Sequence, residues 1–303
     1  MMSRTAIRKR IFVVGVPRSG TTLLQGLLAA HSETTSFTES HFFARHFSLL
    51  PGISSAILTR DPEPRVHEFL DENNEPSVDA ARWFSAKEHW SRRKRLLLPV
   101  YSRTAALQLL RTLDQLTLRR GVPNWIEKTP RHLRYAPFLE RITHGGSRPH
   151  FVHVIRDGLE VVASLHEASQ RWERPYDLET CVRRWNRDVA FSLSRIAAPR
   201  DHFVFYEELT SRPESVLGQL CKELGLAWEP DILERYGGTT DRLVTRQEPW
   251  KADVGRPIHQ SARSEQTLSA EQRDRVRQWL RPDLHRRLRD GVQPPQNLSA
   301  NVD

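Results

Sequence analysis

One short segment constrains the fold of this 303-residue chain more than any other. An apolar run at Ile11–Val14 leads into Gly-Val-Pro-Arg-Ser-Gly-Thr-Thr at residues 15–22, and leucines at helical spacing follow. This order of strand, glycine-rich turn and helix is typical of a phosphate-binding loop, in which backbone N–H groups at the helix start bind an anion. Thr21 stands where a nucleoside triphosphatase carries lysine, so we expect the loop to hold a phosphate without transferring it. The alternative is an ordinary strand-to-helix connection.

The same alternation of apolar runs and helical patterns recurs along the chain. Phe151–Ile155 and Phe203–Tyr206 each precede a helical pattern, and Trp125–Ile126 and Thr35–Phe37 are shorter runs. Strands that alternate with helices build a parallel sheet covered on both faces. The sequence therefore predicts an α/β protein with a P-loop-like three-layer fold and a central parallel sheet of about five strands.

The other segments define the expected domain. Residues 57–118 interrupt the alternation with prolines and with aromatic residues on helical stretches, which predicts a helical insertion. Periodicity is lost beyond Gly237-Gly238, and a polar amphipathic helix is expected at about 269–288. We therefore expect a single domain over residues 1–290, with the insertion at about 57–118, and a flexible tail at 291–303.

Charge and composition narrow the classes of protein to consider. The chain has 46 basic and 37 acidic residues, a net charge of +9, and its arginines are scattered over the whole length. Scatter argues against a dedicated nucleic-acid surface, whereas the positive balance favours a small anionic ligand. No stretch approaches ~18 consecutive apolar residues, and Met1–Arg10 lacks the apolar core of a secretory signal. We expect no transmembrane segment, a cytoplasmic location, and reduced core thiols at Cys181 and Cys221.

Several motifs resemble one enzyme family. Residues 17–24, Pro-Arg-Ser-Gly-Thr-Thr-Leu-Leu, resemble the 5′-phosphosulfate loop of sulfotransferases that use 3′-phosphoadenosine 5′-phosphosulfate (PAPS). Arg156 at a predicted strand end and Ser164 eight residues later resemble the pair that binds the 3′-phosphate in that family. Residues 125–130 resemble the lysine-containing segment of the protein-tyrosine and glycan branches, and residues 206–209 resemble the tyrosine-bearing strand end near the adenine. The resemblance covers residues 10 to about 260.

The resemblance implies a donor-binding site for PAPS, with adenosine 3′,5′-bisphosphate (PAP) as the product and no metal ion. The basic residue that closes over the 3′-phosphate has only a loose match in residues 251–257, because the usual glycine-tryptophan ending is absent. The donor-binding residues that it implies are Arg18, Ser19, Gly20, Thr21, Thr22, Arg156, Ser164, Tyr206, Lys251 and Arg256.

Sulfuryl transfer to a hydroxyl needs a base for the acceptor proton and cations for the oxygens that gain negative charge. Glu39 follows the predicted second strand, where the tyrosylprotein branch carries its glutamate base, so it is our first candidate. His41 and His132 are competing candidates, because imidazole titrates near neutral pH. Lys128 and Arg18 are the candidate cations, although Glu127 could instead pair with Lys128.

Two other classes stay open from the sequence. A P-loop kinase or NTPase shares the strand, loop and helix, and Thr21 in place of lysine argues against it. A basic nucleic-acid-binding protein would explain the charge, but we expect no nucleic-acid partner. The acceptor is undetermined among a glycan, a glycolipid, a secondary metabolite and a peptide tyrosine, and a homodimer is left open.

Overall fold

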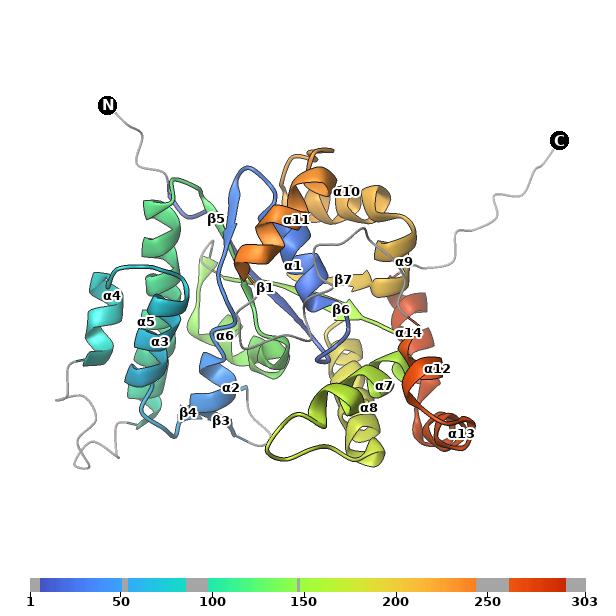
Figure 1. Ribbon diagram of the computed structural model, residues 1–303. Coiled ribbons are helices and arrows are strands. Elements are labelled where there is room, and N and C mark those ends of the chain that lie inside the picture. The colour runs from blue at the N-terminus through green and yellow to red at the C-terminus, as the bar shows by residue number, and fades with distance from the viewer. Residues whose placement is uncertain (1–5, 51–53, 86–97, 146–147, 244–261, 293–303) are drawn as a thin grey trace.

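A parallel sheet forms the centre of the molecule (Figure 1). The computed structural model describes residues 6–50, 54–85, 98–145, 148–243 and 262–292. Its central strands are β1 (Lys9–Gly15), β2 (Thr34–Ser36), β5 (Asn124–Lys128), β6 (His150–Ile155) and β7 (Asp201–Phe205). Within the described residues they pair in parallel in the order β2-β5-β1-β6-β7. Each strand coincides with a predicted apolar run, so the predicted α/β sheet is confirmed.

The central strand β1 shows how the sheet is covered on both faces. Ile11 and Val13 pack into one core cluster, and Phe12 and Val14 pack into another, because successive side chains of a strand point to opposite faces. The first face is covered by α1 (Thr21–Ala29), α9 (Tyr206–Ser211), α10 (Pro213–Leu224) and α11 (Ile232–Leu243). The second face is covered by α2 (Phe42–His46), α5 (Leu98–Arg119), the 3-10 helix η4 (Pro130–Tyr135) and α6 (Ala136–Ile142).

The predicted helical insertion is helical over most of its described length and also contains a strand. It comprises β4 (Ala56–Leu58), which pairs with β3 (Phe47–Leu49) in an antiparallel hairpin, then α3 (Glu63–Glu72), α4 (Asp79–Arg82), the 3-10 helix η1 (Trp83–Ser85) and α5. Figure 1 shows α3, α4 and α5 standing together on one side of the sheet. The predicted extent of the domain is not tested and stays a prediction.

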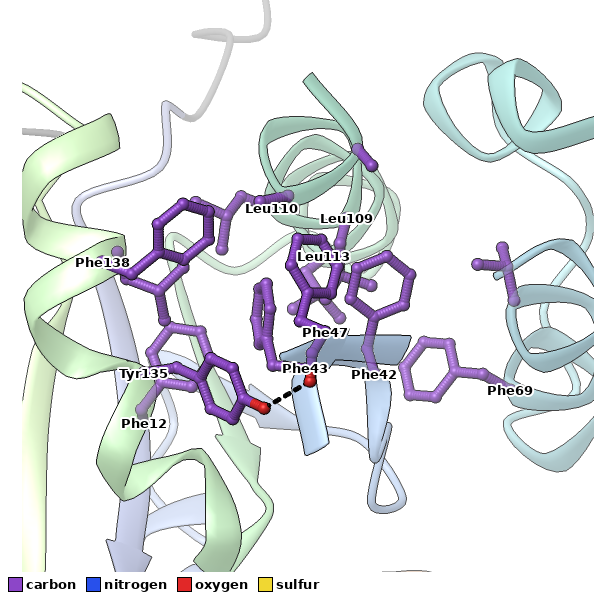
Figure 2. Close-up of a cluster of buried hydrophobic side chains, with 14 of the residues drawn as sticks. Phe12, Phe42, Phe43, Phe47, Phe69, Leu109, Leu110, Leu113, Tyr135 and Phe138 are labelled. Atoms are coloured by element: carbon purple, nitrogen blue, oxygen red, sulfur yellow. Dashed lines mark hydrogen bonds between the residues drawn. The ribbon is translucent and has the colours of Figure 1, made fainter. Parts of the chain in front are cut away.

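An aromatic cluster joins this segment to the sheet (Figure 2). Phe42 and Phe43 of α2 lie between Phe47, Phe69 of α3 and leucines of α5, and all of these side chains are buried. The Tyr135 hydroxyl donates a hydrogen bond to the Phe47 carbonyl at 2.7 Å. Burial of each such aromatic side chain is worth roughly 1.5–3 kcal/mol. The cluster therefore fixes α2 and the residues that immediately precede it.

The C-terminal third differs from the prediction in two places. The helix predicted at 269–288 is two helices, α13 (Ala270–Trp279) and α14 (Pro282–Val292), because Pro282 has no N–H to continue a helix and disfavours the helical conformation at Arg281. The helix α11 continues through Gly237-Gly238, where we expected periodicity to end, and it packs against α1. Packing outweighs the ~1 kcal/mol that each glycine costs in a helix. The helices α7 (Gly158–Ser169), α8 (Leu178–Ser194) and α12 (Arg263–Thr267) complete the described chain.

The cysteines, the membrane-spanning potential and the C-terminal tail were also subjects of prediction. Cys181 and Cys221 are free, buried thiols in different core clusters. No helix in the described ranges is long and apolar enough to cross a membrane. The tail predicted at 291–303 was placed two residues too early, because α14 continues to Val292; the rest of it, residues 293–303, lies outside the described residues, as do Lys251 and Arg256.

We expect the chain to lose stability as the pH falls from about 6.5 to 4, partly because of His150 at the start of β6. Its ring stacks on His202 with an Nδ1 to Nε2 distance of 3.0 Å, and burial, followed by His202, Lys9 and Arg200, lowers its pKa to about 4. The unfolded chain then binds more protons than the folded chain across this window. Through His150 alone, the protein loses about 3 kcal/mol of unfolding free energy as the pH falls. Urea unfolding at pH 7 and pH 5 should show a smaller difference for His150→Gln than for the wild type; an equal difference would contradict the assignment.

Candidate active site

The loop at residues 15–22 has the backbone geometry of an anion-binding turn. Arg18 and Gly20 have φ values of 78° and 94°, which turn the chain sharply before α1 begins. No side chain caps α1 within the described residues, so its first N–H groups point to a place for an anion. The Ser19 hydroxyl is fully buried and has no hydrogen-bond partner in the described part of the chain. A buried hydroxyl without a protein partner is expected where a side chain hydrogen-bonds to a ligand.

Neighbouring atoms leave no room for a side chain at either glycine of the loop. A Cβ atom on Gly15 would lie 2.5 Å from the Val154 carbonyl oxygen of β6, and one on Gly20 would lie 2.3 Å from the ring of Tyr206. Tyr206 therefore packs directly on the loop from the end of β7. Thr21 is buried at the start of α1, and Thr22 is partly exposed beside it.

Two arginines and a serine meet beside this loop. Arg156, which follows β6 and is buried, donates a hydrogen bond to the Arg18 carbonyl at 3.2 Å, and its guanidinium lies 4.2 Å from the centre of the Tyr206 ring. The Arg18 Nε atom donates to the Ser164 hydroxyl of α7 at 3.1 Å. Trp185 of α8 donates to the Arg156 carbonyl at 3.1 Å and fixes this strand end. The structure thus brings together Arg18, Arg156, Ser164 and Tyr206, which are far apart in sequence.

Glu160 connects this cluster to the C-terminal helices, a link that the sequence did not predict. Its carboxylate accepts hydrogen bonds from the backbone N–H groups of Arg263 and Ser264 at the start of α12. It also lies 3.7 Å from the Arg156 guanidinium. A carboxylate at a helix start is favourable because the exposed N–H groups carry partial positive charge. The chain that follows the undescribed residues 244–261 is therefore attached beside Arg156.

The candidate base and one candidate cation form an ion pair. Lys128 ends β5 and is paired in register with Val13 of β1, two residues before Gly15. Its Nζ atom donates to Oε1 of Glu39, and both side chains are largely buried. The other Glu39 oxygen lies 3.6 Å from His41 Nδ1. The sequence-predicted Glu39 and His41, which lie between β2 and α2, are therefore neighbours of Lys128 at the end of the strand beside β1.

The two candidate histidines lie in different surroundings. His41 is next to Glu39 and is partly exposed; burial lowers its pKa to about 4, with the Glu39 carboxylate acting in the opposite direction. His132 is fully buried on η4, where its Nε2 atom accepts a hydrogen bond from the Phe43 N–H at 3.2 Å and its Nδ1 atom contacts Glu127 at 3.0 Å. Both nitrogens of His132 are thus occupied by the protein, and the arrangement favours Glu39 or His41 for proton transfer.

Two residues near the candidate base were not predicted as site residues. Glu127 does not pair with Lys128, because neighbouring residues of a strand point to opposite faces; it bonds to Ser40, Thr129 and His132 instead. Arg65 of α3 donates to the backbone carbonyls of Glu39 and Ser40. The motif that contains Lys128 also contains Glu127, but no sequence signal links Arg65 to Glu39.

The chain is similar in sequence to protein-tyrosine sulfotransferases. The chain is 25% identical over 268 residues to protein-tyrosine sulfotransferase 2 of Gallus gallus, covering 84% of this chain and 62% of that protein. It is 25% identical over 275 residues to protein-tyrosine sulfotransferase 1 of Danio rerio, covering 84% and 64%. The chain thus spans less than two thirds of the length of either relative.

Solved structures show the same fold. The sulfotransferase domain from the Synechococcus PCC 7002 olefin synthase superposes with a TM-score of 0.50 at 19% identity, covering 92% of this chain and 96% of that one. Mouse sulfotransferase SULT7A1 complexed with PAP has a TM-score of 0.50 at 10% identity, covering 95% and 90%. The sequence model of the sulfotransferase family matches residues 10–230, which include the loop, Glu39, Lys128, Arg156, Ser164 and Tyr206. This chain therefore belongs to the sulfotransferase family.

Proposed function

We propose that this protein transfers a sulfuryl group from PAPS to a hydroxyl acceptor. The observation that supports the proposal most directly is the convergence of an uncapped helix start, the Arg18 and Arg156 guanidinium groups, and the Ser164 hydroxyl beside the pair formed by Glu39 and Lys128. A donor with phosphate groups at both its 5′ and 3′ positions needs two anion sites, and these groups supply both.

The residues of the site fit such a donor. The N–H groups at the start of α1 and the buried Ser19 hydroxyl would hold the 5′-phosphosulfate, because they have hydrogen-bonding capacity that the described protein does not use. Arg156 and Ser164 would hold the 3′-phosphate, and Tyr206 would contact the adenosine. When bound, PAPS supplies an activated sulfuryl group with PAP as its leaving group.

The candidate catalytic residues have complementary tasks in an in-line displacement. Glu39 would accept the proton of the acceptor hydroxyl as the acceptor oxygen bonds to sulfur. Lys128 and Arg18 would stabilise the negative charge that develops on the bridging and sulfuryl oxygens as the old sulfur–oxygen bond breaks. Because both cations are held by hydrogen bonds before any ligand arrives, little reorganisation is needed during the reaction.

Ligand-dependent melting tests this proposal before the acceptor is known. We expect PAP to raise the melting temperature much more than ATP with Mg²⁺, because Arg156 and Ser164 offer a site for a 3′-phosphate, whereas Thr21 replaces the lysine that tracks the β- and γ-phosphates. Preferential stabilisation by ATP with Mg²⁺ would favour the kinase or NTPase class, and nucleic acid that alone stabilises the protein would favour the nucleic-acid-binding class.

Transfer itself is measured with ³⁵S-labelled PAPS. Parallel reactions contain a tyrosine peptide, 4-nitrophenol, N-acetylglucosamine, or cell extract, and each is repeated with EDTA. We expect labelled product in at least one reaction, and the rate should survive EDTA because Arg18, Lys128 and backbone N–H groups can carry the developing charge. No label transfer in any reaction from a protein that binds PAP would contradict the proposed activity.

A further inference from the structure

The four consecutive backbone N–H groups that follow Glu39, the last two of them in the first turn of α2, all donate to side chains. The N–H of Ser40 donates to the Glu127 carboxylate at 3.3 Å, and that of His41 donates to the Thr129 hydroxyl at 3.2 Å. The N–H of Phe42 donates to the Ser40 hydroxyl at 3.4 Å, and that of Phe43 donates to His132 Nε2 at 3.2 Å. A five-residue helix such as α2 is not stable on its own, so these contacts and the aromatic cluster of Figure 2 determine where it begins.

One of these N–H groups reaches the Glu127 carboxylate directly, and the side chains that accept the other three all bond in turn to that carboxylate. Glu127 is fully buried and accepts from the Ser40 hydroxyl at 2.7 Å, the Thr129 hydroxyl at 2.6 Å and His132 Nδ1 at 3.0 Å. Because His132 Nε2 accepts a hydrogen bond from Phe43, the ring proton is on Nδ1 and points to Glu127. Burial raises the pKa of Glu127, but the contacts with His132, Thr129 and Ser40 lower it overall, so the group is an ionised acceptor.

The same stretch of chain is held from its other side by Arg65. That guanidinium donates to the carbonyls of Glu39 and Ser40, and it is itself paired with Glu68 and Glu72 of its own helix. The N–H groups of the segment are thus fixed by β5 and η4, and its carbonyls are fixed by α3. Between these two supports, His41 adopts a positive φ of 51°, which a non-glycine residue adopts only when its surroundings require it.

We propose that Glu127 is a positioning residue for sulfuryl transfer, which acts through Ser40, Thr129 and His132 to fix the segment that presents the Glu39 carboxylate to Lys128. The inference rests on the proposed function, in which Glu39 is the base. Neighbouring residues of β5 then have different roles. Lys128 faces the reacting groups, whereas Glu127, on the opposite face of the strand, supports the segment that carries Glu39, the partner of Lys128.

Glu127→Gln is the direct test, because glutamine keeps the size but presents an N–H₂ group to a partner that donates. If that group faces His132, the ring must move its proton to Nε2, which then opposes the Phe43 N–H. We expect kcat with PAPS, and with an acceptor that the wild type uses, to fall by on the order of 10²-fold, since a displacement of about 1 Å near the chemistry has this effect. PAP affinity should not change.

A double substitution separates positioning from a general loss of stability. If Glu127 acts through Glu39, then adding Glu127→Gln to Glu39→Gln should lower kcat no further. Additive losses would overturn the proposal. Asp201→Asn is the matched control: the Asp201 side chain is also fully buried and bonded to a histidine, three strands away in the same register row, so its loss should lower the melting temperature without changing kcat.

Amide hydrogen exchange supplies a readout that does not depend on turnover. We expect the N–H groups of residues 40–43 to exchange slowly in the wild type and quickly in Glu127→Gln, with those of β6 unchanged. If the wild type transfers no sulfuryl group, the proposed function fails even where this exchange result holds; unchanged exchange at residues 40–43 overturns the positioning role alone. Should Glu127→Gln not fold, Ser40→Ala removes one of the three relays and is expected to produce a smaller loss of kcat with PAP affinity retained.

Discussion

Replacing Glu39 with glutamine is expected to lower kcat by about 10²- to 10⁴-fold, because the loss of a general base has this effect on transfer steps. The Lys128 ammonium and the Arg18 guanidinium stay in place in this variant, and the groups proposed to hold the donor are on other elements. Donor affinity should therefore change little. Single-turnover rates with labelled PAPS, together with calorimetry of PAP binding, measure the two quantities separately.

Substitution of the two candidate histidines tests whether Glu39 is the base. Near-normal turnover in Glu39→Gln with a collapse in His41→Ala would transfer the role of base to His41, and a collapse in His132→Ala alone would show loss of the segment that His132 supports. A pH profile would not show a His41 base as a titration near neutral pH, because burial lowers the pKa of His41 to about 4. The turnover rates of Glu39→Gln and His41→Ala therefore identify the base.

Replacing Arg156 with alanine is expected to weaken PAP binding by about 10- to 150-fold, the equivalent of ~1.5–3 kcal/mol for a lost charge-assisted hydrogen bond. Adenosine 5′-phosphate should lose much less affinity, because it lacks the 3′-phosphate that Arg156 and Ser164 are proposed to bind. Calorimetry with both ligands measures the difference. Arg156 also supports the loop through the Arg18 carbonyl, so the ratio between the two ligands is the informative quantity.

The chain offers a matched control for this substitution. Arg184 of α8 also stacks on a tyrosine, with its guanidinium 4.2 Å from the centre of the Tyr176 ring, and it donates a hydrogen bond to the hydroxyl of that tyrosine. Arg184→Ala should leave the affinity for both ligands unchanged. An equal loss of both ligands in Arg156→Ala would assign that residue to support of the loop instead of recognition of the 3′-phosphate.

The sheet was predictable because its signals are local. The run Ile11–Val14 is apolar throughout, as a strand buried on both faces requires, and Gly15 follows it. The hairpin of β3 and β4 was missed because its strands have only three residues each, too few for an alternating pattern to stand out. The break at Pro282 was visible in the sequence, but the amphipathic pattern on either side of it concealed the break.

The site was predictable only in part, for a different reason. Arg18, Arg156 and Lys128 stand at or just after the ends of parallel strands, and Ser164 lies on the helix that follows β6, so the order of elements predicts that they gather at one edge of the sheet. Arg65 lies in the first turn of α3, and its contact with the Glu39 carbonyl depends on how the inserted segment packs against the sheet. Glu127 was visible beside Lys128, yet its partners depend on the direction in which β5 presents each side chain.

The strand order has a consequence for how this protein can be altered. In the sheet, β5 and β2 lie on one side of β1, and β6 and β7 lie on the other. The groups proposed to hold the donor follow β6 and β7, and the proposed base and its supports follow β2 and β5. These two halves of the site lie on either side of the loop after β1. Engineering of acceptor preference can therefore concentrate on α2, α3 and the neighbouring hairpin while the donor half is kept unchanged, and new acceptor chemistry can be selected without rebuilding the donor site.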